Sequence, residues 1–417
     1  MLVNSKDIEL FESYKKYISS TYPAFLTKLG LDRVAAKAEG AIITDSAGKM
    51  YIDCVGGYGL FNIGHNHIEV IQSLIDQLNK KQLFTKPFIT DIQVTLAEAL
   101  AKVTPGDLTC SFLCNSGSEA IDNAIKLARL HSGKKLIITA NNSFHGYTYG
   151  ALSASGISRF KRFFEPMVPE IANVRFGDTE SLKASITEDT AAVLLEPIQH
   201  EAGITLPPKN YFKEVRRLCD EKQCILILDE IKTGCGKTGY MFACEHFGIV
   251  PDILVLGKAL GGGLIPIGGL VAKKNLWKKF SMNFSMSASS FANNVLACRA
   301  ALSTLEILKR DNIPEECRKK GLYLLEELKT LVIKFPALLK DVEGLGLLLG
   351  LKTDSPQNAI EIAQRMISQG VILFPAYGDP SVLMIEPPLI ITYEQMQIIL
   401  QSLYKACNTL TLKREGK

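Results

Sequence analysis

From about residue 105 to residue 275, short apolar runs alternate with segments that repeat hydrophobic residues at helical spacing. Such alternation is typical of βαβ units, and it predicts a mostly parallel sheet whose strands are covered on both faces. The helical segment "EAIDNAIKLARLH", for example, places Ile121, Ile125 and Ala128 on one face. The predicted strands are the runs "TCSFLC" (109–114), "KLIITA" (135–140), "AAVLLEP" (191–197), "CILILDE" (224–230), "DILVLGK" (252–258) and "GGLVA" (268–272).

The pattern changes towards both ends of the chain. After about residue 312 it predicts a helix, a strand "LGLLLGLK", a helix, two strands "VILFP" and "SVLMIEP", and a final helix, which indicate a smaller α+β lobe. Near the N-terminus, "AIITDSAGKMYIDCV" predicts a hairpin that could pack on either lobe. We therefore expect an N-terminal segment (1–55) that contributes to the small domain, a large domain (56–311) and a C-terminal small domain (312–417).

The composition is that of an ordinary globular protein. The 417 residues are 47% hydrophobic and 22% charged, which excludes a disordered or fibrous chain. The net charge is only +4 with basic and acidic residues interspersed, so nucleic acid is not an expected partner. The longest apolar stretch, 253–272, is interrupted by Lys258 and rich in glycine and proline, so it is not expected to cross a membrane.

Cysteine usage and the N-terminal residues bear on the location of the protein. The ten cysteines include no CxxC pair, and several lie inside apolar runs, as expected in a reducing compartment. The N-terminal stretch "KDIELFESYKKYI" contains three acidic residues and lacks a basic segment followed by an apolar one, so no secretory signal is expected. Both features favour a cytoplasmic location.

Polar residues follow four of the predicted strands of the large domain. The segment 115–118 (Asn-Ser-Gly-Ser) follows the first strand, Glu196 and Asp229 end the third and fourth, and Lys258 ends the fifth. Because ligands bind beyond the carboxyl ends of parallel strands, these side chains are expected to meet at one edge of the sheet.

Each of these residues also has an ordinary structural explanation. "NSGSEA" could simply cap a helix, Asp229 could form an ion pair, and Lys258 could extend its amine to solvent. Together, however, they match one cofactor. Pyridoxal phosphate needs an anion cradle for its phosphate, a carboxylate at its pyridine nitrogen, and a lysine that holds its aldehyde.

Two other kinds of site are not supported by the sequence. "GCGKTG" contains Gly236, Lys237 and Thr238 in the order found in a nucleotide-binding P-loop, but that motif needs a glycine where Ile231 stands. The six histidines show no HExxH or similar spacing, so no metal site is expected.

Several longer motifs resemble the class III, ornithine-type aminotransferases of the pyridoxal phosphate fold type I group. The resemblance runs from about residue 40 to the C-terminus, and residues 240–275 look closest to the putrescine aminotransferase branch. It implies an aspartate aminotransferase-like α/β fold with a large, mostly parallel seven-stranded sheet domain and a smaller α+β domain. The motifs are "YGLFNIGHNHIEV", "NSGSEAIDNAIKLAR", "SFHGYTYGALSAS", "LLEPIQHEAGI", "LILDEIKTGCGKTG", "FACEHFGIVPDILVLGKALGGGLIPIGG" and "IEPPLIIT".

The resemblance implies a role for each matching residue around the cofactor. Lys258 would hold the cofactor aldehyde and act as the base of the 1,3-proton transfer, and Asp229 would hold the pyridinium nitrogen. Ile231 and Phe144 would contact the two faces of the ring. The remaining cofactor residues would be Gly117 and Ser118 at the phosphate, Ser290 from the second subunit of a homodimer with shared active sites, and Glu196 and His145 behind them.

The chain also departs from the family pattern. Lys232 stands where the family usually has glutamine, near the cofactor phenolate oxygen, and "SFANNV" around Ser290 replaces the usual "TFGGNP". Two arginines that bind substrate carboxylates in many members are absent, because Tyr147 and Met384 occupy their positions. The expected substrate residues are Tyr58, Tyr147, Glu201 and Met384.

The loss of the second arginine affects Glu201, whose equivalent pairs with it in ornithine-type members. An unpaired carboxylate in a pocket is costly unless a ligand cation neutralises it, so we hypothesise that Glu201 receives the distal ammonium of an amine substrate. Alternatively, Glu201 bonds to Lys232, Lys237 or nearby backbone. Arg159 or Arg162 could hold the carboxylate of the amino donor.

These features predict a pyridoxal phosphate aminotransferase that acts on an amine (a polyamine, an amino sugar or another ω-amine) and an oxo acid by a ping-pong mechanism. A racemase, epimerase or lyase on the same fold would use the same lysine and cradle, so these remain alternatives. A non-catalytic relative is disfavoured because Lys258, Asp229 and Ser118 are all present.

Overall fold

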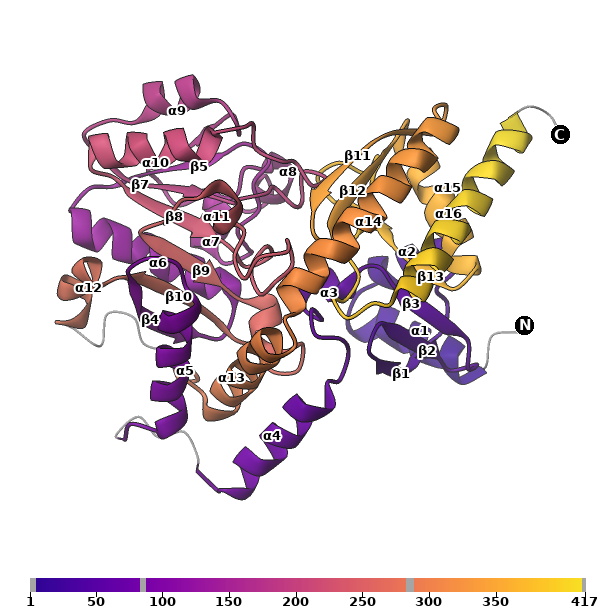
Figure 1. Cartoon of the computed structure of the whole chain (residues 1–417), viewed down its shortest axis with the longest axis horizontal. Coiled ribbons are helices and arrows are strands. Elements are labelled where there is room, and N and C mark those ends of the chain that lie inside the picture. Colours follow the sequence, from indigo (N-terminus) through magenta and orange to yellow (C-terminus); the bar gives the residue numbers. More distant parts are fainter. Residues whose placement is uncertain (1–4, 83–87, 283–288, 415–417) are drawn as a thin grey trace.

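A seven-stranded sheet forms the centre of the larger part of the molecule (Figure 1). The computed structural model describes residues 5–82, 88–282 and 289–414. Neighbouring strands are parallel except β10, which is antiparallel to both of its neighbours, so the sheet is mostly parallel as predicted. In spatial order the strands are β4 (Leu108–Cys114), β10 (Gly268–Lys273), β9 (Ile253–Leu256), β8 (Ile225–Asp229), β7 (Thr190–Leu195), β5 (Leu136–Ala140) and β6 (Ile171–Val174).

The strands of this sheet are continuous apolar runs because helices cover both faces. In β8, Ile225 and Ile227 belong to one core cluster, whereas Leu226 and Leu228 belong to the other. This alternation follows from the two-residue period of a strand. The first cluster includes residues of α6 (Gly117–Ser132), α7 (Tyr149–Ala154) and α12 (Lys274–Ser281), and the second includes residues of α5 (Asp91–Val103), α10 (Tyr211–Lys222) and α13 (Val295–Arg310).

Six of the seven strands correspond to the predicted apolar runs, and the seventh does not. β6 has the sequence Ile-Ala-Asn-Val and lies at the edge of the sheet, where only Val174 is buried. An edge strand of four residues with an asparagine carries little hydrophobic signal, so only the family resemblance predicted it.

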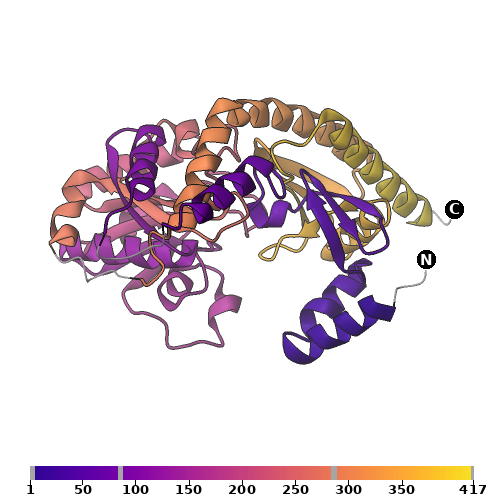
Figure 2. The ribbon, with the colours of Figure 1, turned by 90° about the horizontal axis from the view of Figure 1, so that it is seen from below.

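Two four-stranded sheets make up the smaller part of the molecule (Figure 2). One consists of β11 (Leu339–Leu345), β12 (Leu348–Thr353), β15 (Val382–Ile385) and β14 (Phe374–Pro375), and it packs against α14 (Ile313–Lys334) and α15 (Pro356–Ser368). The other consists of β1 (Ala35–Glu39), β2 (Ile42–Asp45), β3 (Met50–Asp53) and β13 (Val371–Ile372). The predicted N-terminal hairpin is β2 and β3, and β3 pairs in parallel with β13 of the C-terminal region.

Two strand predictions in this region are wrong in detail. "LGLLLGLK" is not one strand, because the chain turns at Gly346 and Leu347 between β11 and β12. Gly346 has a φ of +56°, and a Cβ there would lie 2.5 Å from the Thr238 carbonyl carbon, so the tight turn needs glycine. "VILFP" divides at the buried Leu373 into β13 and β14, which belong to different sheets.

The remaining helices connect or flank these sheets. Figure 2 shows α1 and α2 projecting beside the N-terminal sheet, while α14 and α16 lie along the outside of the C-terminal sheet. No helix within 5–82, 88–282 or 289–414 is both long and apolar enough to span a membrane. The remaining bounds are α1 (Ser5–Tyr17), α2 (Thr21–Leu29), α3 (Gly56–Gly59), α4 (Ile68–Asn79), α8 (Ser158–Lys161), α9 (Thr179–Ser185), α11 (Cys244–Phe247), the 3₁₀ helix η1 (Lys258–Gly261) and α16 (Tyr393–Arg414).

Candidate active site

The carboxyl ends of four strands of the large sheet surround one pocket. β4 leads into α6, β7 is followed by Glu196, β8 ends at Asp229, and η1 begins at Lys258 shortly after β9. Side chains from all four segments line a cavity of about 150 Å³. The lining residues are Ser116, Gly117, Ser118, Phe144, His145, Gly146, Glu196, Ile198, His200, Glu201, Asp229, Ile231, Lys232, Thr233 and Lys258.

The backbone at Lys258 has a conformation that is unusual for a residue with a side chain. Its φ is +44°, in the left-handed region, and such strain costs roughly 1–3 kcal/mol and is typical of functional sites. A Cβ at the preceding Gly257 would lie 3.3 Å from Cα of Gly117, so glycine lets this turn pack against the start of α6. The Lys258 amine has no hydrogen bond or ion pair to any described residue, so it is free to react.

The carboxylate of Asp229 is buried, and each of its oxygens has a partner. Asp229 is 4% exposed; Oδ2 lies 2.7 Å from Nδ1 of His145, and Oδ1 accepts a hydrogen bond from the Ile231 backbone N–H at 3.0 Å. His145 is also buried, and its Nε2 has no partner among the described residues. These two contacts fix the orientation of the carboxylate at the pocket wall.

The start of α6 supplies backbone N–H groups without acceptors. Ser116 caps the helix through its hydroxyl, whereas the amides of Gly117 and Ser118 have no acceptor among the described residues. Glycine is required at two places here, because a Cβ at Gly117 would lie 2.7 Å from Cδ1 of Ile231, and one at Gly146 would lie 2.0 Å from Oγ of Ser118. Free amides at a helix N-terminus can bind a phosphate group.

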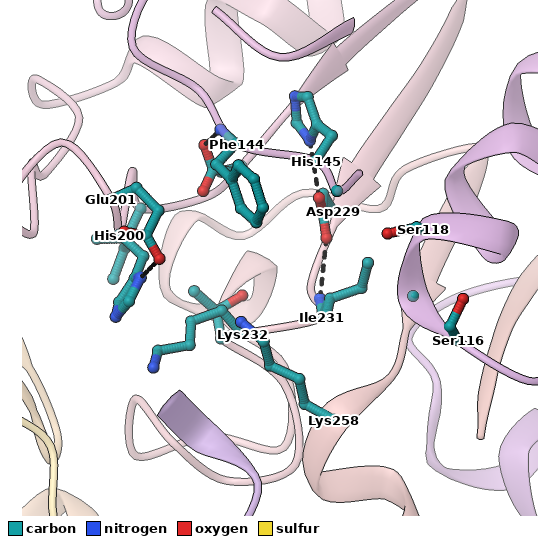
Figure 3. Close-up of a pocket in the computed structure, with 15 residues that line it drawn as sticks. Ser116, Ser118, Phe144, His145, His200, Glu201, Asp229, Ile231, Lys232 and Lys258 are labelled. Carbon is teal, nitrogen blue, oxygen red and sulfur yellow. Dashed lines mark hydrogen bonds and ion pairs between the residues drawn. The ribbon is translucent and has the colours of Figure 1, made fainter. Parts of the chain in front are cut away.

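Phe144 and Ile231 provide apolar walls for the pocket. Figure 3 shows the Phe144 ring directed into the space that Ile231 and Lys258 border. The backbone N–H of Phe144 donates to Oε2 of Glu196 at 3.1 Å. Burial, and then repulsion by Asp229, raises the pKa of Glu196 well above its usual range. Its contact with the Phe144 amide positions the Phe144 segment.

Four polar side chains, Lys232, Glu386, His200 and Glu201, form a continuous network beside the pocket. Figure 3 shows His200 and Glu201 on the side away from Ser116 and Ser118. Nζ of Lys232 contacts Oε2 of Glu386, the fully buried residue that follows β15. Oε1 of Glu386 lies 3.3 Å from Nε2 of His200, and Nδ1 of His200 lies 3.1 Å from Oε1 of Glu201. The Lys232 amine, expected near the cofactor phenolate, is therefore engaged by Glu386 from the small domain.

Burial and neighbouring charges shift the pKa values within this network in opposite ways. Burial lowers the pKa of Lys232 to about 7. The charge of Glu386 raises this pKa, and the charges of Lys258 and Lys237 lower it further. Burial alone would raise the pKa of Glu386, but Lys232 and His200 outweigh it and hold that pKa well below its usual range. Lys232 is therefore the member of this pair that titrates near neutral pH.

This lysine predicts a pH-dependent contribution to stability. Its pKa is about 7 in the folded protein and near 10.5 when unfolded, so unfolding takes up a proton between these values and the free energy of unfolding rises with pH. Relative to Lys232→Gln, the wild type should gain about 1 kcal/mol of unfolding free energy for each pH unit above pH 7. Urea unfolding of both proteins at pH 7, 8 and 9 measures this gain.

The matched control is Lys213→Gln, which changes an exposed lysine on α10. Its difference from the wild type should stay constant over the same range. A constant difference for Lys232→Gln as well would contradict the assignment of a lowered pKa to Lys232.

The P-loop-like segment has a structural role. Lys237 is completely buried, and its amine donates to the backbone carbonyls of Glu386 at 2.8 Å and Pro387 at 2.9 Å. These bonds join the loop after β8 to the segment after β15. Lys237 thereby helps to place Glu386 behind the pocket.

Of the four predicted substrate residues, only Glu201 lines the cavity. Tyr147 is 67% exposed, and its ring packs edge-on against Phe144 with centroids 5.0 Å apart. Met384 is 2% exposed and lies in a small apolar cluster with residues such as Ile204. Met384 therefore fills space in the small domain next to the site.

Two other predicted residues lie outside the cavity. Tyr58 has its hydroxyl 3.2 Å from the hydroxyl of Tyr377, and their rings stack with centroids 5.9 Å apart. Ser290 is exposed and does not line the pocket of its own chain. The alternative partners for Glu201 are not used either, since Lys232 contacts Glu386 and Lys237 bonds to backbone carbonyls.

Sequence reasoning missed several residues of the site. His200 is absent from the predicted site, although it stands beside Glu201 in "EPIQHEAG". Glu386 lies in "IEPPLIIT" after an apolar strand and before two prolines, and this position is the signal that it is buried. The other lining residues not predicted individually are Ser116, Gly146, Ile198 and Thr233.

The residues present fit pyridoxal phosphate. A free lysine amine, a buried carboxylate, free amides at a helix N-terminus and two apolar walls face one cavity. Each of these matches one part of that cofactor: the aldehyde, the ring nitrogen, the phosphate and the ring faces. The fold and the site together define a pyridoxal phosphate-dependent enzyme.

The chain belongs to the class III aminotransferase family, whose model matches residues 28–407. Similar solved structures include the ornithine aminotransferase from Toxoplasma gondii, at 28% identity and a TM-score of 0.90 over 99% of this chain and 97% of that one. A transaminase from the marine bacterium Virgibacillus has 26% identity and a TM-score of 0.91 over 97% and 99%. The acetylornithine aminotransferase from Elizabethkingia anophelis has 27% identity and a TM-score of 0.84 over 97% and 99%.

Within the described residues, no group of three or more His, Cys, Asp or Glu side chains is arranged to hold a metal ion.

Proposed function

We propose that this aminotransferase moves an amino group between an amine-bearing substrate, such as a polyamine, an amino sugar or another ω-amine, and an oxo acid. The two substrates would use the same pocket in turn, in a ping-pong mechanism. One observation carries the choice of an amine. Oε2 of Glu201 is buried without a partner, in a pocket whose described lining contains no arginine.

The chain's own residues would divide the work at the cofactor. Bound pyridoxal phosphate supplies an electron sink for the electrons of a bond broken at the substrate carbon. Nζ of Lys258 would hold the aldehyde and would be the group that accepts and returns a proton, because it has no competing partner in the pocket. Asp229 holds the proton of the ring nitrogen, supported by His145. Gly117 and Ser118 would bind the phosphate, and Phe144 and Ile231 would orient the ring. Glu196 would support Phe144 through its backbone N–H.

Glu201 is suited to bind a cation. Burial raises its pKa, but the contact with His200 and the charges of Lys258 and Lys232 outweigh burial, and the net shift is downward. Glu201 is therefore an anion with one unoccupied oxygen. A buried carboxylate oxygen without a partner is favoured to accept a hydrogen bond from a ligand.

We expect Glu201→Gln to raise the KM for 1,4-diaminobutane by about 10-fold to 100-fold and to leave the KM for 1-aminobutane within about twofold. A hydrogen bond between two charged groups contributes on the order of 1.5–3 kcal/mol, and only the diamine has a second ammonium. Steady-state kinetics with one oxo acid measure both values. The exposed Glu188→Gln is the control. Equal increases for the two amines would refute this role.

The proposed reaction is tested by a screen of amine donors and oxo acid acceptors, followed through the absorbance of the bound cofactor. A productive amine should convert the cofactor to its amino form in the absence of acceptor, and an oxo acid should reverse the change. Racemisation or elimination without this reversible conversion would contradict transfer.

We also propose a homodimer in which Ser290 of the partner subunit completes the phosphate site. Ser290 is exposed and does not line the pocket of its own chain, so it is available to the pocket of a partner subunit. A cytoplasmic location is supported by the ten free cysteine thiols, which suit a reducing compartment.

A further inference from the structure

His200 has a carboxylate at each of its two ring nitrogens. Nε2 faces Glu386 at 3.3 Å and Nδ1 faces Glu201 at 3.1 Å, and the ring is 2% exposed. The other buried histidines differ, because His65 and His145 each contact a carboxylate through one nitrogen only. All six histidines lie within the described residues, and His200 alone among them has this arrangement.

This arrangement constrains the protons on His200. A neutral imidazole donates through one nitrogen and accepts through the other, so it can satisfy two carboxylates only if one of them is protonated. Oε2 of Glu386 contacts the amine of Lys232, and neighbouring groups that include Lys232 and His200 hold the pKa of Glu386 well below its usual range. Oε1 of Glu201 lies 3.1 Å from Nδ1 of His200, and the net shift of the Glu201 pKa is downward. With both carboxylates ionised, both accept and both ring nitrogens must donate.

We propose that His200, doubly protonated between Glu386 and Glu201, is a positioning residue that keeps Glu201 ionised and oriented for the distal ammonium of a diamine substrate. The proposal rests on the proposed function and deepens it. Lys232 completes the network, because its amine contacts the second oxygen of Glu386 and can donate to it in either protonation state. Before a ligand binds, Oε2 of Glu201 then has no partner, but the charge of this carboxylate is balanced by His200.

The network explains how Glu201 can stay ionised without an arginine. Burial is the largest influence on its pKa and acts upward; the hydrogen bond from His200 and the His200 charge are the largest influences in the opposite direction. The other titratable groups that interact with it are Lys258, Lys232, Glu196 and Tyr147. Without His200, burial should dominate and Glu201 should hold a proton at neutral pH.

The charge of His200 can be observed without enzyme turnover. Two-bond ¹H–¹⁵N spectra of holoenzyme labelled with ¹⁵N-histidine should show, at pH 8, one histidine with both nitrogens protonated, and His200→Asn should remove that signal. Exposed histidines are neutral at this pH. If His200→Asn does not fold, Glu386→Gln should instead return the signal to the neutral form. A neutral His200 in the wild type would overturn the proposal even if transamination is confirmed.

The positioning role is tested by the ratio of KM for 1,4-diaminobutane to KM for 1-aminobutane between pH 6.5 and 9. The ratio cancels the pH dependence of the reacting amine, which both compounds share. In the wild type it should vary less than about threefold. In His200→Asn it should rise about 10-fold or more from pH 9 to pH 6.5, as Glu201 gains a proton; one decade corresponds to 1.4 kcal/mol.

Two further variants separate this role from general damage. His67→Asn, at the residue before α4 and outside the site, should behave as the wild type, since asparagine is a good residue at a helix start. Adding Glu201→Gln to His200→Asn should abolish the pH dependence of the ratio. A pH-independent ratio in His200→Asn would overturn the proposal, whereas a lack of reaction with either amine would contradict the proposed function instead.

Discussion

Replacement of Lys258 by alanine should reduce the rate of amino transfer by about 10⁴-fold or more. Lys258 has two proposed tasks, covalent attachment of the cofactor and proton transfer, and a positioned general base alone contributes about 10²–10⁴-fold. Rapid-mixing measurements of the half-reaction with a single amine would give the rate. The exposed Lys274→Ala on α12 is the control and should retain full activity.

The structure says why Lys258, rather than a neighbouring lysine, should carry the cofactor. Lys232 also has a lowered pKa, which makes an amine more nucleophilic, but its Nζ contacts Glu386. Lys237 donates to two backbone carbonyls. Lys258 alone of these three has no such partner. Borohydride reduction followed by peptide mapping should therefore label Lys258, and a label on Lys232 would show that the assignment is wrong.

The large sheet and the residues at its strand ends could be predicted because both signals are local in the sequence. A strand covered on both faces must be an apolar run, and a polar residue that ends such a run lies at the sheet edge. Glu196, Asp229 and Lys258 all follow this rule, and the structure brings them to one pocket. The edge strand β6 does not follow it, because it is short and only partly buried.

The network of His200 and Glu386 could not be predicted in the same way. Glu386 comes from the small domain, and its contacts with Lys232 and His200 depend on how the two parts of the chain pack. No spacing in the sequence encodes that packing. The strand break at Gly346 is equally non-local, since a Cβ there would lie 2.5 Å from the carbonyl carbon of Thr238, more than 100 residues earlier.

The missing arginines could be predicted from the sequence, but their consequence could not. Met384 fills an apolar cluster, so the loss of an arginine there leaves no hole. Glu201 is instead contacted by its sequence neighbour, His200. The sequence suggested an unpaired carboxylate, whereas the structure gives it one partner and leaves one oxygen available.

Replacement of Asp229 by asparagine should lower the rate by about 10²–10⁴-fold while leaving the fold intact. Asparagine has nearly the same shape and can still accept the Ile231 N–H that Asp229 accepts at 3.0 Å. It carries no negative charge, however, and a charge in a buried site is what stabilises a protonated ring nitrogen on the cofactor. The half-reaction rate, the cofactor absorbance and the dissociation constant of the cofactor should all change, and thermal stability without cofactor should not.

The matched control is Asp178→Asn, because Asp178 caps α9 through the same kind of side-chain oxygen that asparagine offers. It should behave as the wild type. His145 allows a second test of the same idea, since its Nδ1 lies 2.7 Å from Asp229 and orients the carboxylate without touching the reacting atoms. His145→Gln should therefore have a smaller effect than Asp229→Asn, and its effect should largely vanish when Asp229 is already asparagine. If the two substitutions instead act additively, His145 contributes by another route and the ring nitrogen does not depend on this pair.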